Sequence, residues 1–439
     1  MSKAFIKELD ELVKANILTP EKAQEISTYY SAQTNTKPNR FSIVVNILGA
    51  LLAGLGIILV IAHNWDELSR LAKTLIAFIP LLIGQSLCAY TLLKQKNSVS
   101  WRECSAIILS LAVASCVSII GQVYHIDGTL SGFLLTWMLL IIPLVYLMPS
   151  SVTALLYIAG ITWYACETGY FTYSSRQIPV YYTGLLALIL PHYYHFYKYK
   201  RDSNFFTLLN WMLVLSVTIV LGSFASDSLD RSIWVFAAYL GLFCIYYLIG
   251  RSDLFENKRL FANPFLVTGV LGILAILFSW SFDWLWNDEV DRYYIGRERP
   301  YVYGSPFLYI TIVMLAIAGW QIATGYRRVK KTIVDPAGFS GFVFVVLVLS
   351  GNPQLGVLLT NFWILFVAIF FIRKGTLQDH LGILNFGLVI IALLATFRFF
   401  DDKIPFIWRG LFFLTTGAGF FVGNYLLVKK RKTLEKNNL

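Results

Sequence analysis

The chain has 439 residues, of which 57% are hydrophobic and 14% are charged. Soluble globular domains carry about 25% charged residues, so the composition excludes an ordinary soluble protein and predicts an all-α membrane protein. The net charge of +11 does not indicate nucleic acid, because the basic residues are spread over short segments between apolar stretches. Such a distribution is typical of anchoring at an anionic membrane surface.

Residues 1–40 are polar and predict a small cytoplasmic helix-turn-helix unit. Phe5, Leu9 and Val13 recur at helical spacing, and Thr19-Pro20 reads as the N-cap and first position of a second helix. Two helices this short bury little surface by themselves. We therefore expect them to dock on the membrane domain, to self-associate or to bind a cytoplasmic partner.

Residues 41–428 predict a transmembrane domain, which a basic cytoplasmic tail at 429–439 follows. A spanning helix needs about 20 mostly apolar residues, and about fourteen segments of the chain meet this requirement. They run over 41–62, 70–93, 104–123, 130–148, 151–168, 179–197, 204–224, 231–249, 261–282, 306–325, 333–350, 354–372, 379–399 and 405–428. The fold class is thus a polytopic helical bundle in contact with the lipid bilayer.

The charge pattern predicts the orientation of this bundle. With a cytoplasmic N-terminus, 26 of the 36 Lys and Arg residues fall on the cytoplasmic side. This is the asymmetry that the positive-inside rule describes, and it places the C-terminus in the cytoplasm as well. The five cysteines lie in or beside apolar helices without paired spacing in an outer loop, so we expect neither disulfides nor a metal site, and no cofactor.

Three polar clusters stand at the predicted outer ends of helices, where they could converge into one extracytoplasmic site. Polar groups are costly in a bilayer and for that reason are candidate functional residues. The clusters are His63, Asn64, Asp66, Glu67 and Arg70; Gln122, Tyr124, His125 and Asp127; and Arg398, Asp401, Asp402 and Arg409. The alternative is that they are ordinary capping residues in contact with water.

Four side-chain amides fall near the predicted bilayer midplane: Asn46, Gln85, Asn361 and Asn385. They could line a substrate cavity or form hydrogen bonds between helices. One long outer segment, Asp283 to Ser305, alternates Trp and Tyr with charges. It predicts either an interfacial flap or a lid over a substrate.

Two segments, AHNWDEL (62–68) and GQVYHIDG (121–128), together with NILTPEKAQEI (16–26), resemble an uncharacterised family of bacterial polytopic membrane proteins that is catalogued as a domain of unknown function. The resemblance covers residues 1–165. In the related pattern Gly-Asp commonly follows YHI, whereas this chain has Asp127-Gly128-Thr129. The resemblance implies a multi-pass protein of the bacterial inner membrane and supplies no catalytic residues.

Three classes of function fit these features. A transporter or flippase for a nonpolar or lipid-linked substrate is favoured, because the chain has many spans and no soluble catalytic domain. A membrane-embedded transferase could use Asp66 or Glu67 as a base, with Arg70, Arg398 or Arg409 holding a diphosphate. A scaffold or sensor would act through residues 1–40. The sequence contains no P-loop, dinucleotide fingerprint, nucleophile elbow or HExxH motif.

Overall fold

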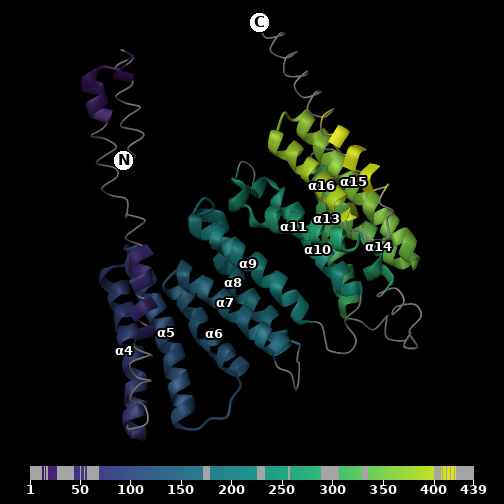
Figure 1. The fold of residues 1–439 in the computed structure, drawn as a ribbon. Coiled ribbons are helices and arrows are strands. Elements are labelled where there is room, and N and C mark those ends of the chain that lie inside the picture. Colours follow the sequence, from purple (N-terminus) through teal and green to yellow (C-terminus); the bar gives the residue numbers. More distant parts are fainter. Residues whose placement is uncertain are drawn as a thin grey trace. The chain divides into compact units, whose positions relative to one another are not determined.

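The structure is a computed structural model, and the residues that it describes form only helices and loops (Figure 1). These residues are 69–171, 178–224, 233–255, 258–287, 306–328 and 335–399, with scattered positions in 12–26, 44–56 and 407–421. They divide into two compact units, Met1–Tyr157 and Ile158–Leu439. The all-α class is confirmed for this part of the chain.

Three helices of the first unit begin directly after a residue whose side chain caps the helix. Its helices are α4 (Arg70–Lys94), α5 (Val99–Val123), α6 (Leu130–Leu147) and the beginning of α7 (Ser151–Cys166). The hydroxyls of Ser69, Ser98 and Thr129 each accept a hydrogen bond from the backbone amide three residues later, which satisfies a donor that the helix itself cannot. At Gly84 a Cβ would lie 2.9 Å from the Cα of Leu109, so the missing side chain lets α4 and α5 approach closely.

The second unit packs its helices around α10. Its helices are α8 (Val180–Tyr199), α9 (Asn204–Ser223), α10 (Ile233–Gly250), α11 (Pro264–Ser279), α13 (Pro306–Arg328), α14 (Ser340–Ser350), α15 (Pro353–Leu377) and α16 (Leu381–Phe399). α10 is apolar on all sides, and Ala237, Ala238 and Cys244 are completely buried, as expected of a central helix. At Gly269 a Cβ would lie 2.5 Å from the backbone nitrogen of Tyr247, so α11 contacts α10 backbone to backbone.

Eight of the described helices are long and apolar enough to cross a membrane: α4, α5, α6, α9, α10, α13, α15 and α16. Each expected span between residues 70 and 399 contains a helix, but α7, α8, α11 and α14 are not among these eight. α7 and α11 have only 16 residues and α14 has 11, so the expected number of spans is not confirmed. The expected spans 41–62 and 405–428 lie outside the described residues, apart from helical positions in 44–56 and 407–421. The chain is a multi-pass membrane protein.

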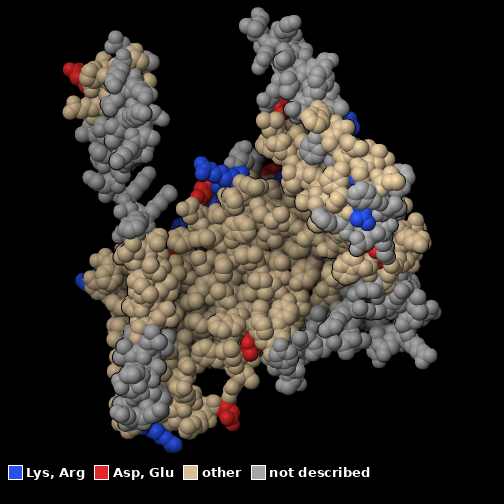
Figure 2. Space-filling view, viewed as in Figure 1, with Lys and Arg blue, Asp and Glu red and all other residues tan. Residues whose placement is uncertain are grey.

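The surface of these helices suits a lipid environment. Figure 2 shows that the visible face is mostly tan, with Lys, Arg, Asp and Glu in isolated spots. Large apolar side chains point outward, among them Leu93 with 81% of its surface exposed and Leu71 with 74%. Because a helix satisfies its backbone hydrogen bonds internally, it can present such side chains to lipid. The described helices therefore contact the bilayer.

The structure also describes the cysteines and part of the N-terminal segment. All five cysteines are free, as their spacing predicts. In the N-terminal segment residues 20–26 are helical, and the Ala23 amide donates to the Thr19 carbonyl at 3.0 Å, as expected for a helix that begins after Thr19. The remainder of the expected helix pair lies mostly outside the described residues.

Candidate functional site

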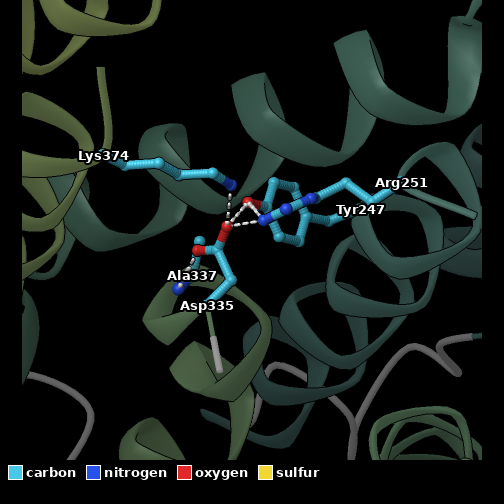
Figure 3. Close-up of polar contacts among 5 residues, drawn as sticks. All are labelled: Tyr247, Arg251, Asp335, Ala337 and Lys374. Atoms are coloured by element: carbon cyan, nitrogen blue, oxygen red, sulfur yellow. Dashed lines mark hydrogen bonds and ion pairs between the residues drawn. The ribbon is translucent and has the colours of Figure 1, made fainter. Parts of the chain in front are cut away.

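Asp335, whose side chain is largely buried, is the centre of an ionic cluster in the second unit (Figure 3). Its Oδ1 accepts from the backbone amide of Ala337 at 3.3 Å, which caps the short helix η5 (Pro336–Phe339). Its Oδ2 accepts from the Tyr247 hydroxyl, from Nη1 of Arg251 and from Nζ of Lys374, the last at 3.3 Å. One oxygen therefore receives three side-chain donors.

This cluster joins three elements of the fold. Tyr247 lies in the last turn of α10, Arg251 follows that helix directly, and Lys374 lies near the end of α15. The Asp335 side chain is only 8% exposed, while Lys374 is 17% and Arg251 29% exposed. A carboxylate with so little exposed surface is stable as an ion only when it is paired and hydrogen-bonded. The two cations meet this need and leave one positive charge in excess.

Nothing in the local sequence marks these residues as a site. Arg251 and Lys374 appear there only as basic residues at predicted cytoplasmic helix ends, and Asp335 is 84 and 39 residues away from them. The one available signal is Asp335-Pro336, the pattern of an N-cap followed by a first-position proline.

A second polar cluster brings together two of the residues predicted from the sequence. Arg398, at the end of α16, donates from Nη2 to Ser281 Oγ at 2.9 Å, and its guanidinium carbon lies 4.3 Å from the centre of the Phe282 ring. Asn361 of α15 donates to the Ser281 carbonyl at 3.0 Å. The Oδ1 of Asn361 is buried and has no hydrogen-bond partner within the described residues. Ser281 thus connects α15 with α16 just beyond α11.

The rest of the third predicted cluster is only partly described. Nη1 of Arg409 donates to the Phe399 carbonyl at 3.1 Å, which places Arg409 at the same end of α16 as Arg398. Asp401 and Asp402 lie outside the described residues.

The first two predicted clusters belong to the first unit. Arg70 begins α4 and is exposed, as are Gln122, Tyr124, His125 and Asp127 at the end of α5. The Thr74 hydroxyl lies 3.3 Å from that of Tyr124, so the start of α4 and the end of α5 are adjacent. His63, Asn64, Asp66 and Glu67 lie outside the described residues.

His125 has a specific backbone role at the end of α5. It adopts a left-handed conformation with φ of 50°. Its amide donates to the Gln122 carbonyl at 3.4 Å, and the Ile126 amide donates to the Gly121 carbonyl at 2.9 Å. These two bonds form a Schellman motif, in which glycine is the usual residue at the left-handed position.

We expect His125→Gly to retain or raise the thermal stability of the protein and His125→Val to lower the free energy of unfolding by about 1–2 kcal/mol. The reason is that only glycine adopts positive φ without steric cost. Thermal unfolding in detergent measures both effects. The glycine variant also tests the imidazole, because a loss of function with unchanged stability would assign it a chemical role.

Of the four predicted midplane amides, only Asn361 is partly buried. Asn46, Gln85 and Asn385 are exposed on their helices. Asn46 and Gln85 belong to the first unit, and Asn361 and Asn385 belong to the second. Among the described residues no group of three or more His, Cys, Asp or Glu side chains could hold a metal ion.

The first unit also contains a buried carboxylate that the sequence did not single out. Glu103 lies on α5 and is only 2% exposed. It accepts hydrogen bonds from the Ser150 hydroxyl at 2.5 Å and from the Ser151 and Val152 amides at 2.9 and 3.0 Å. It therefore caps the N-terminus of α7 from another helix, where a negative charge is favourable.

Residues 10–154 match a family model described as "Predicted membrane protein (DUF2157)". This segment is a DUF2157 domain. The resemblance seen in AHNWDEL and GQVYHIDG is thereby confirmed, since both motifs lie inside the DUF2157 segment. The DUF2157 segment also contains Glu103 and the helix start that it caps. No curated protein and no solved structure shows significant similarity to the chain.

Proposed function

We propose that the chain is a transporter or flippase of the bacterial inner membrane that moves a nonpolar or lipid-linked substrate. In this proposal the transmembrane domain covers 41–428 with about fourteen spans, and the helix pair 1–40 and the tail 429–439 both lie in the cytoplasm. The Asp335 cluster then lies at the cytoplasmic end of the second unit, and the Ser281 cluster lies at the outer end.

One observation carries the proposal: α15 has two polar attachments, one about two turns after its start and one near its C-terminal end. Asn361 bonds to Ser281, and Lys374 bonds to Asp335, with about 20 Å between the two along the helix axis at 1.5 Å per residue. The segment 362–372 between them is hydrophobic, although Trp363 also donates a hydrogen bond to Ser340 Oγ at 3.0 Å. A tilt of α15 would break one attachment while keeping the other, which is the kind of two-state element that alternating access requires.

The outer surface of α15 suits a substrate with a lipid tail. Leu358, Phe362, Phe366 and Ile369 recur at helical spacing and are each more than half exposed, so they form one apolar stripe along the helix. A lipid tail could stay in contact with this stripe while its polar headgroup exchanges between the two clusters. The intramembrane ionisable residues are the natural sites for that headgroup.

The test is lipid scrambling or flipping in proteoliposomes, measured with fluorescent phosphatidylglycerol and with fluorescent phosphatidylcholine. We expect the wild type to accelerate transfer of at least one probe, and Asp335→Asn or Arg398→Gln to slow it about tenfold or more. Arg373→Gln is the matched control, because Arg373 is exposed and lies next to Lys374 in the sequence.

Three outcomes would argue against this proposal. Transfer rates equal to those of protein-free liposomes with both probes would contradict it. A chemically altered lipid-linked product would favour the transferase, and loss of function only on deletion of residues 1–38 would favour the scaffold.

A further inference from the structure

Arg251 and Lys374 have hydrogen-bonding capacity that Asp335 does not use. In the described part of the chain, the side-chain hydrogen bonds of Arg251 involve Nη1 only, which contacts Asp335 and, at 3.2 Å, the Tyr247 hydroxyl. Its Nε and Nη2 form the other edge of the guanidinium fork. Lys374 uses one of three N–H groups on Asp335. Two cations thus share one carboxylate and retain free donors.

The exposure of Asp335, Lys374 and Arg251 determines which of them an incoming ligand contacts first. Asp335 is innermost at 8% exposure, whereas Lys374 and Arg251 are 17% and 29% exposed. A ligand that approaches the ends of α10 and α15 therefore reaches cations before it reaches the carboxylate. The excess positive charge favours an anion, and Asp335 holds both cations in position while the site is empty.

We infer that Arg251 and Lys374 form a binding site for a phosphate group. The Nε–Nη2 edge of an arginine matches two oxygens of a phosphate, and lysine adds a point charge. Basic sites between spanning helices on the cytoplasmic side suit anionic lipid headgroups. A lipid headgroup and free phosphate present the same chemistry, and the experiment separates them. The inference takes two elements from the proposed function: the cytoplasmic position of this end of the helices, and the phosphate as part of the transported substrate.

The experiment uses the full-length chain in a maltoside detergent. Native mass spectrometry measures binding of phosphatidylglycerol and phosphatidylcholine, and thermal unfolding measures the response to inorganic phosphate. We expect phosphatidylglycerol to bind and phosphatidylcholine to bind far more weakly. Arg251→Gln and Lys374→Gln should each weaken binding about tenfold, since each removes a charged hydrogen bond. Arg373→Gln should bind as the wild type does, and Arg251→Lys should lose part of the affinity, because it keeps the charge without the fork.

Asp335→Asn should change the affinity for phosphatidylglycerol in the opposite direction to Arg251→Gln and Lys374→Gln. It removes the competing carboxylate, so we expect it to bind phosphatidylglycerol several-fold more tightly, whereas a purely structural role for the cluster predicts weaker binding. A response to inorganic phosphate without lipid binding would support the site and assign free phosphate as its ligand. Binding that is the same in Arg251→Gln, Lys374→Gln and the wild type would overturn the inference, and so would the absence of both lipid binding and a response to inorganic phosphate. Intact binding with no lipid transfer in proteoliposomes would reject the proposed function alone.

Discussion

Glu103→Ala is expected to lower the free energy of unfolding by about 3–5 kcal/mol, one of the two largest single effects that we predict. The carboxylate accepts three hydrogen bonds at the start of α7, from Ser150, Ser151 and Val152. Alanine would leave these donors buried without an acceptor and would also leave a cavity. Unfolding in mixed micelles of maltoside and dodecyl sulfate measures the change.

Two variants control this prediction. Glu103→Gln keeps one acceptor oxygen and should show an intermediate loss, because a neutral amide accepts more weakly than a carboxylate. Asp127→Ala removes an exposed acidic side chain of the same unit and should change stability by less than about 0.5 kcal/mol. If Glu103→Ala were as stable as Asp127→Ala, the carboxylate would not hold α7.

Asp335→Ala is expected to lower the free energy of unfolding, measured in phosphate-free buffer, by about 2–4 kcal/mol. Removing the buried partner leaves Arg251 and Lys374 as adjacent unpaired cations. We place the value below that for a fully buried pair, since water reaches Arg251 in part. Unfolding in the same mixed micelles measures the effect, and adding Lys374→Met to Asp335→Ala should recover part of the loss, because it removes one of the two unpaired cations.

Asp202 is the matched control for the Asp335 prediction. It forms an ion pair with Lys258 but is 88% exposed. The hydrogen bond and charge of Lys258 hold the pKa of Asp202 below its ordinary value, yet solvent screens the pair. Asp202→Ala should therefore leave stability unchanged. Equal effects of Asp202→Ala and Asp335→Ala would show that burial does not set the strength of the Asp335 cluster.

Between residues 70 and 399 the sequence by itself was sufficient to predict where the helices lie. In a bilayer each spanning segment satisfies its own backbone hydrogen bonds, so a local apolar run suffices to specify a helix. Short polar signals then set the boundaries, as with Ser69 and Thr129 at the starts of α4 and α6. The motifs around His63 and His125 were also sufficient to indicate the family to which residues 10–154 belong.

Only the tertiary structure decided which polar side chains meet. Arg398 bonds to Ser281 over 117 residues, and Asp335 bonds to Arg251 over 84. Glu103 bonds to the start of α7 over 47 to 49 residues. Apolar periodicity shows that a helix exists but does not say which helix lies beside it, because lipid and protein interiors are similarly apolar. The candidate sites follow from helix neighbours, and these depend on close contacts such as that of Gly269 with Tyr247.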